Sequence, residues 1–160
     1  MRNCGNDVLD DQPWLLFQDY LYRAQEFYDA FRQLPAGAPP SWPRYFRLCH
    51  AIELALKAFL ALHGATPKEL RNNFRHKLEL LTDKAVAKGL GLRPCVVNEI
   101  KLLDEAHRKH WPRYPRHEGK PVFVIDQFEP YVVELLEAVS AAGPAAEAAV
   151  KTGIISGLED

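Results

Sequence analysis

Apolar side chains recur at alternating spacings of three and four along most of the chain, which is the period of an amphipathic helix. The pattern predicts helices over residues 13–34, 41–63, 76–88, 93–111 and 127–142. An apolar run, residues 122–125, suits a short extended piece, but one such run does not make a sheet. The fold class predicted is therefore all-α, an up-and-down bundle of four to five helices.

The starts of several predicted helices carry capping residues. Ser41 suits the N-cap of the second helix, and Thr66-Pro67 suits a further N-cap and first helical turn. Asp126 and Glu129 have the spacing of a capping box, with Asp in the usual Ser/Thr place. These signals predict where the second and last helices begin and place a short helical turn between the second and third.

Helix-breaking residues predict the ends of the later helices and the extent of the domain. Gly89 and Gly91 follow the third helix, and Gly143-Pro144 is expected to close the last one. We therefore expect one helical bundle domain over residues 1–144, followed by a tail or weak helix over 145–160.

The second predicted helix is apolar around most of its circumference, which indicates a central position in the bundle. Its polar interruptions are Arg47, His50, Glu53 and Lys57, which fall within about 120° of arc. Glu53 and Lys57 form an i,i+4 pair of the favourable order. This polar stripe suits a pocket or contact surface, or else a solvent face or salt bridge, and the sequence favours the second interpretation.

Composition sets the class of protein. The 160 residues are 48% hydrophobic and 26% charged, as in one ordinary globular domain, which excludes a disordered chain and a collagen-like repeat. No uncharged apolar run approaches the roughly 20 residues of a spanning helix, so no membrane association is expected. The N-terminal residues lack the apolar core of a secretory leader, and three scattered cysteines, Cys4, Cys49 and Cys95, lack zinc-site spacing. A cytoplasmic protein without structural disulfides is expected.

The net charge of −1 conceals a strong asymmetry along the chain. Residues 1–31 hold six acids and two bases, residues 32–120 eight acids and 17 bases, and residues 121–160 seven acids and one base. Net neutrality therefore does not exclude a polyanionic partner, because the middle of the chain is strongly basic.

The densest basic stretch is residues 107–120, with five Lys or Arg, three His and one acid. Cations that contact phosphates and aromatic rings that stack on bases suit a single-stranded RNA surface. The alternative is that these charges are solvated or pair with the acidic terminal helices. The residues predicted to contact RNA or a nucleotide are Arg75, Arg108, Lys109, Trp111, Arg113, Tyr114 and Arg116.

Arg71 and His76, five residues apart at the start of the third predicted helix, are candidate catalytic residues. An imidazole titrates near neutrality and suits transfer of the proton of a 2′-hydroxyl group, and a guanidinium offsets charge that builds on the phosphate. The alternative is that His76 lies in a first helical turn and Arg71 is a solvated loop residue.

Metal and cofactor chemistry has weaker support. His107 and His110 are i,i+3, and the other carboxylates and imidazoles that could complete a ligand set are Asp104, Glu105, His117 and Glu118. No HExxH motif, phosphate-binding loop, dinucleotide fingerprint or nucleophile elbow is present in the sequence. The prediction is that the protein holds no metal and no cofactor.

The residues of two helices resemble the HEPN domain family. His50-Ala51-Ile52-Glu53-Leu54-Ala55-Leu56-Lys57-Ala58-Phe59-Leu60 resembles the E-L-x-L-K-x-L helix of that family. After a glycine and a polar connector, His76-Lys77-Leu78-Glu79-Leu80-Leu81 resembles its H-x-L-x-x-L element, and Arg113-Tyr114-Pro115 resembles a further frequent feature. The resemblance covers about residues 14–142, and its motifs are short and degenerate.

The resemblance implies a compact helical bundle that forms a homodimer and associates with RNA or nucleotides, often in toxin–antitoxin or defence settings. It implies a metal-independent endoribonuclease with an R-x4–6-H motif, which Arg71-Asn72 and His76 fit. The motif precedes the helix after the E-L-x-L-K element, where non-catalytic relatives also carry a histidine. The alternative is therefore a non-catalytic module for nucleotide binding or protein interaction, with an antitoxin or a nucleotidyltransferase as partner.

Overall fold

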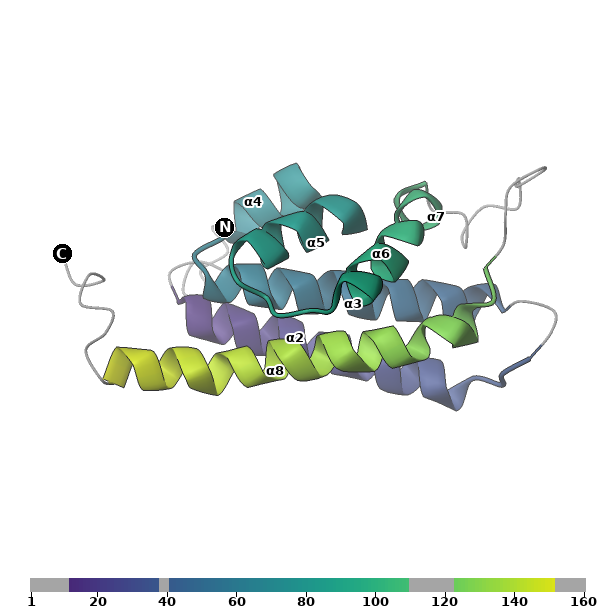
Figure 1. Cartoon of the computed structure of the whole chain (residues 1–160), viewed down its shortest axis with the longest axis horizontal. Helices are drawn as coiled ribbons and strands as arrows, with labels where there is room; N and C mark the ends of the chain where they lie inside the picture. The colour runs from purple at the N-terminus through teal and green to yellow at the C-terminus, as the bar shows by residue number, and fades with distance from the viewer. Residues whose placement is uncertain (1–11, 38–40, 110–122, 152–160) are drawn as a thin grey trace, which may run out of the picture.

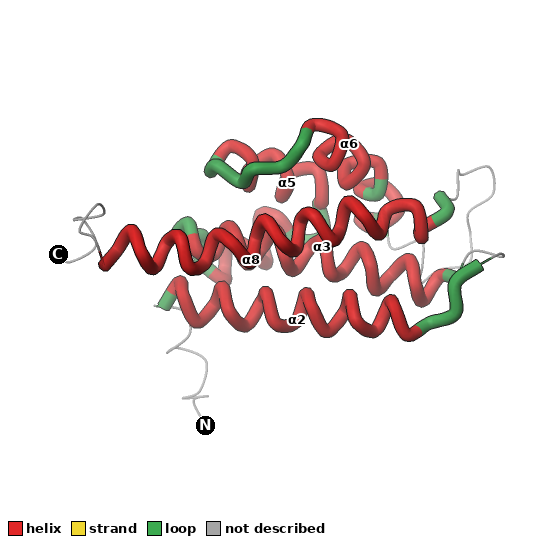
Figure 2. The backbone as a smooth tube through the Cα atoms, turned by 60° about the horizontal axis from the view of Figure 1, so that its bottom comes forward, coloured by secondary structure: helices red, strands yellow, loops and turns green. Residues whose placement is uncertain are grey.

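The computed structural model describes residues 12–37, 41–109 and 123–151. Every regular element within these ranges is helical, which confirms the predicted all-α class. Three long helices run side by side along the longest axis of the molecule (Figures 1 and 2). They are α2 (Pro13–Gln33), α3 (Trp42–Leu62) and α8 (Glu129–Lys151).

Shorter helices form a layer along one side of α3, and a 3-10 turn precedes α8 (Figure 1). The layer consists of α4 (Pro67–Glu69), the π-helical turn η1 (Leu70–Phe74), α5 (Leu78–Ala87), α6 (Pro94–Leu102) and α7 (Asp104–Arg108). The 3-10 turn is η3 (Ile125–Phe128). None of the helices in the described ranges is both long enough and apolar enough to cross a membrane.

Helix α3 lies at the centre of the bundle, as its apolar circumference predicts. It packs against α2, α8 and α5, and every residue from 51 to 61 is buried. Its first turn is capped by Ser41, whose hydroxyl accepts a hydrogen bond from the Arg44 amide. Thr66 and Glu69 form a reciprocal capping box at α4, so both N-caps predicted around α3 and α4 are confirmed.

The beginning of the last helix differs from the prediction. Asp126 lies inside η3, and its carboxylate accepts a hydrogen bond from Arg44 Nε at 3.0 Å rather than forming a capping box. Arg44 is 5% exposed and also donates to the carbonyls of Phe31 and Leu34 at the end of α2. This buried arginine joins the ends of three helices, which a local capping pattern could not reveal.

The predicted end of the last helix is also wrong. Helix α8 continues through Gly143 and Pro144 to Lys151 instead of stopping at residue 142. Pro144 lacks one helical N–H donor, but packing of α8 on α2 outweighs that loss. Gly143 is required for this packing, because a Cβ there would lie 2.7 Å from a ring carbon of Phe17.

The predicted fourth helix is broken into two. It divides at Leu103, which is fully buried, and the next residue, Asp104, accepts a hydrogen bond from the Glu79 amide at 3.1 Å. This hydrogen bond joins the first turn of α5 to the start of α7. The predicted helix end before Pro112 lies outside the described residues. The apolar run 122–125 is described from residue 123 onward, and its last residue, Ile125, begins η3.

Candidate functional site

A buried carboxylate lies in the middle of α3. Glu53 is 1% exposed, and its Oε1 accepts a hydrogen bond from Lys57 Nζ at 2.6 Å. Its Oε2 accepts two more, from His107 Nε2 at 2.6 Å and from His76 Nδ1 at 3.0 Å. We call these residues, together with the adjacent His50, the Glu53 cluster.

Three stretches of chain build the Glu53 cluster. Lys57 lies one turn after Glu53 on α3, His76 lies between η1 and α5, and His107 lies on α7. Burial by itself would raise the pKa of the Glu53 carboxyl. The three neighbouring imidazoles and the Lys57 ammonium outweigh burial and hold that pKa well below its usual range. The carboxylate is therefore ionised at neutral pH.

An ionised carboxylate only accepts hydrogen bonds, so it determines which nitrogen of each histidine carries the proton. His76 donates through Nδ1 and His107 through Nε2. His107 is 3% exposed and belongs to the core, whereas the His76 side chain keeps 40% exposure. His76 is thus a partly exposed imidazole whose orientation and tautomer are set by a buried anion, which is the arrangement of a general base.

His50 approaches the same carboxylate without bonding to it. Its Nδ1 is buried, has no hydrogen-bond partner in the described residues and lies 3.7 Å from Glu53 Oε2. Phe27 and Phe46 flank the ring. One ligand atom each from His50, Glu53 and His107 lie within 4.8 Å of one another, as in a metal site. The Lys57 ammonium 2.6 Å from the carboxylate disfavours a divalent cation, so we assign Glu53 as an acceptor of N–H donors.

The segment that carries Arg71 and His76 has unusual backbone geometry. Arg71 is exposed on the π-helical turn η1, and Arg75 at its end has φ 46° and ψ −117°, which side-chain-bearing residues rarely adopt. Such conformations cost of order 1–3 kcal/mol and cluster at functional sites. Here the turn directs the next residue, His76, back onto α3 and Glu53.

Tyr20 on α2 also belongs to this region, and no pattern in the sequence indicated it. Burial raises the pKa of the Tyr20 hydroxyl, the Arg71 charge opposes that rise, and the Glu53 charge adds to it. Its hydroxyl therefore lies in the field of both groups.

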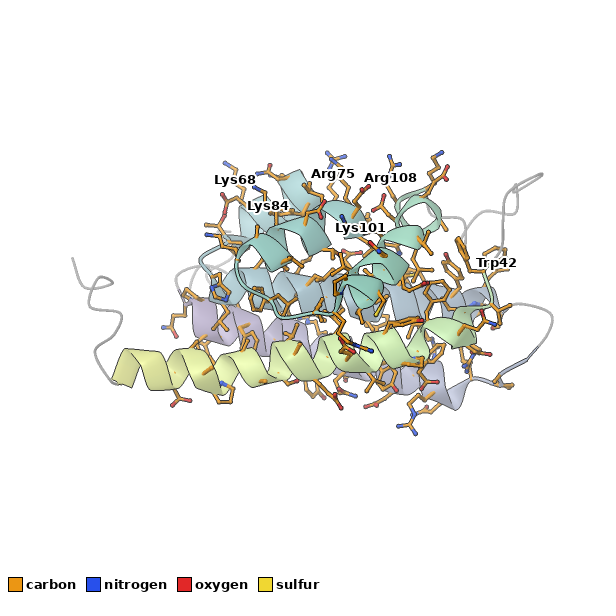
Figure 3. The ribbon with its side chains drawn as sticks, viewed as in Figure 1. Trp42, Lys68, Arg75, Lys84, Lys101 and Arg108 are labelled. Carbon is orange, nitrogen blue, oxygen red and sulfur yellow. The ribbon has the colours of Figure 1, made fainter. Side chains whose placement is uncertain are left out.

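Among the described residues, the segment 67–88 carries most of the positive charge that has no ion-pair partner. Six side chains in α4, η1, α5 and their connections make no ion pair or hydrogen bond within the described part of the chain. Figure 3 shows two of them, Lys68 and Arg75, projecting from the layer on the side away from the long helices. We call this set the basic segment: Lys68, Arg71, Arg75, Lys77, Lys84 and Lys88.

Other basic residues do pair with acids. Arg93 binds Glu134 on α8, as expected if the basic middle of the chain pairs with the acidic terminal helices, and Lys101 binds Asp83. Of the predicted basic loop, Arg108 and Lys109 are exposed at the end of α7 and pair with acids four residues earlier. Trp111, Arg113, Tyr114 and Arg116 lie outside the described residues.

Two of the four polar-stripe residues of α3 are buried, and Arg47 and His50 are half-buried. Glu53 and Lys57 form the i,i+4 salt bridge that their spacing favours, at 1% and 7% exposure, so the solvent-face interpretation is wrong for them. Arg47 donates to the Ala30 carbonyl of α2 at 3.0 Å. The stripe is polar because α2, the η1 connection and α7 bring hydrogen-bonding groups to it.

Comparison with known proteins identifies no relative of this chain. No protein-family model, no curated protein and no solved structure matches it.

Proposed function

We propose that this chain is an HEPN-like RNA-binding protein that cleaves RNA without a metal at Arg71 and His76. The observation that carries the proposal is the hydrogen bond from His76 Nδ1 to the buried Glu53 carboxylate, 3.0 Å long, within a stretch of unpaired cations. In this proposal the basic segment binds the phosphates, and His76 acts on the sugar.

The chemistry needs a base, a proton donor and charge stabilisation. The His76 imidazole takes the proton of a 2′-hydroxyl as its oxygen attacks the adjacent phosphorus and the bond to the 5′-oxygen breaks. The leaving oxygen takes a proton from the imidazolium or from water. Arg71 offsets the charge on the phosphoryl oxygens. Glu53 is a positioning residue that acts through His76.

A second candidate is a non-catalytic module that binds RNA or a partner protein. It is favoured by the fact that Glu53 also holds His107 and Lys57, since the carboxylate then serves the core whether or not His76 reacts. The homodimer and the antitoxin or nucleotidyltransferase partner implied by the family resemblance stay predictions.

Cleavage of single-stranded RNA in the presence of a chelator separates the two candidates. We expect the wild type to produce 2′,3′-cyclic phosphate ends, and His76→Ala and Arg71→Ala to lose this activity. Arg32→Ala, which removes an exposed arginine at the other end of the bundle, near the C-terminal end of α2, is the matched control and should keep it. Equal cleavage by wild type and His76→Ala would remove the assigned mechanism, and no cleavage by any of them would favour the non-catalytic module.

RNA binding is tested separately by fluorescence anisotropy across salt concentrations. Changing Lys68, Arg75 and Lys77 to Gln should weaken binding and reduce the slope of log affinity against log salt by about 0.7 for each phosphate that the variant no longer neutralises. Arg93→Gln removes a cation that Glu134 already neutralises and should change the slope little. If the triple variant binds like the wild type, the basic segment is not the RNA surface.

A further inference from the structure

A pocket of about 400 Å³ opens where α3 ends, between η1 and α5. Its apolar wall is formed by Leu60, Phe74 and Leu80. This volume falls in the range of small-molecule sites, which combine apolar walls with a few polar groups. None of the residues of the Glu53 cluster lines it, and it shares only Lys84 and Lys88 with the basic segment.

The polar groups of this pocket are mostly cationic. Lys84 and Lys88 lie one turn apart at the end of α5, and neither side chain has an ion-pair partner in the residues that the structure describes. His63 lines the same pocket, where burial and the Lys88 charge both lower its pKa. Like charges four residues apart on a helix repel each other, so the pair is better satisfied by an anion than by its own neighbours.

The one acid among the described residues of the pocket wall, Glu69, makes no ion pair with either lysine. Glu69 Oε2 accepts hydrogen bonds from the Thr66 amide at 2.9 Å and from the Thr66 hydroxyl at 3.1 Å. The carboxylate is thereby committed to the capping box of α4. Two ammonium groups against this one carboxylate leave a net positive charge in the pocket wall, beside an aromatic side chain.

We propose that this pocket binds a small phosphomonoester with an aromatic body. The phosphate lies between the Lys84 and Lys88 ammonium groups, and the ring packs on Phe74. The Asn73 amide, also in the wall, bonds polar edges of the ring. The source is either a free small molecule or the 5′-terminal nucleotide of an RNA strand. The inference does not rest on RNA cleavage, because the pocket contains neither Arg71 nor His76 and shares only Lys84 and Lys88 with the basic segment.

Calorimetric titration of the full chain with AMP, phenyl phosphate, inorganic phosphate and adenosine tests the proposal. We expect AMP and phenyl phosphate to bind at least about tenfold more tightly than phosphate or adenosine, since only they use both halves of the pocket. Lys84→Gln and Lys88→Gln should each weaken AMP binding about tenfold, as the loss of one charge-assisted hydrogen bond does. Phe74→Leu should weaken AMP binding and leave phosphate binding unchanged.

Lys101→Gln is the matched control, because it removes one lysine charge from α6, outside the pocket, where Asp83 pairs it. It should leave AMP binding within about twofold. No binding of AMP or phenyl phosphate, equal affinity for inorganic phosphate, or equal weakening by all three lysine variants would overturn the proposal. If a 5′-phosphorylated oligoribonucleotide competes with AMP and a 5′-hydroxyl oligoribonucleotide does not, the ligand is the 5′ end of an RNA strand. If neither oligoribonucleotide competes, the ligand is a free small molecule.

Discussion

His76 donates a hydrogen bond through Nδ1 to Glu53 Oε2 at 3.0 Å, although the two residues come from different layers of the fold. The same carboxylate oxygen accepts from His107, and the other oxygen accepts from Lys57. Glu53 therefore connects the central helix to both the η1 connection and α7. Replacing the Glu53 carboxylate should change the stability of the fold, the dependence of that stability on pH, and the His76 site, and each effect can be measured on its own.

Glu53→Gln should lower the free energy of unfolding by about 3–5 kcal/mol, measured by urea denaturation. The reason is that the Lys57 ammonium, at 7% exposure, loses its anion without gaining water. Glu105→Gln is the matched control, because Glu105 also pairs with a lysine four residues later but at the surface. That change should cost less than about 1 kcal/mol. Equal costs would show that burial does not strengthen the Glu53 pair.

The stability of the wild type should fall as the pH drops below about 5, and more steeply than that of Glu53→Gln. Folding holds the pKa of Glu53 far below its ordinary value of 4.5. Below pH 4.5 this group therefore binds a proton in the unfolded chain but not in the folded chain. The stabilisation from this group is complete above that ordinary pKa and is lost toward acid. Urea denaturation over a pH series from neutral to acid measures the difference between the two slopes.

Parallel curves for the two proteins would contradict the assignment of Glu53 as the titrating group. The difference between the two curves reports Glu53 together with the histidines that contact it, because Gln removes the negative charge that faces them. The other titratable groups that face or electrostatically reach Glu53 are His50, Lys57 and Cys49 on α3, His76, His107 on α7 and Tyr20 on α2.

Arg75→Gly should stabilise the fold by roughly 1 kcal/mol, because φ 46° and ψ −117° strain any residue with a Cβ. Arg71→Gly is the matched control, since Arg71 lies inside the helical turn η1 and glycine there should cost about 1 kcal/mol. The same Arg75 change should weaken RNA binding. A loss of stability in Arg75→Gly would show that the arginine side chain stabilises the fold by more than its strained backbone conformation destabilises it.

The fold could largely be predicted from the sequence because helical periodicity is a local property. The near-continuous apolar surface of α3 identified it as the central helix, and the structure buries every residue from 51 to 61. Local rules failed where a distant contact outweighed them. Asp126 has capping-box spacing but binds Arg44, which is 82 residues away in sequence.

The candidate site was predictable only in part, for the same reason. The i,i+4 pair of Glu53 and Lys57 is visible in the sequence, but its burial is not. His107 reaches Glu53 across 54 residues, and nothing in its spacing distinguished a core donor from a metal ligand. The sequence shows that the middle of the chain is basic. Only the structure shows which of these cations form ion pairs, such as Arg93, and which do not.

Gly143→Ala should destabilise the protein even though alanine is the better helix former. Helix propensity favours alanine by about 1 kcal/mol, but a Cβ here would lie 2.7 Å from Phe17 Cε1 and 3.3 Å from Trp14 Cη2. Phe17 is 3% exposed and stacks on Trp14, so the ring has no space to withdraw into. Overpacking of this kind costs about 1–3 kcal/mol, which leaves a net loss.

Pro144→Ala is the matched control for Gly143→Ala, because it changes the next residue of the same helix at an exposed position. Alanine restores a helical N–H donor there, so this variant should gain stability, by as much as about 3 kcal/mol. Thermal and urea denaturation of both variants should therefore move in opposite directions. A rise in stability for Gly143→Ala would contradict the close approach of α8 to Phe17, since helix propensity alone would then decide the outcome.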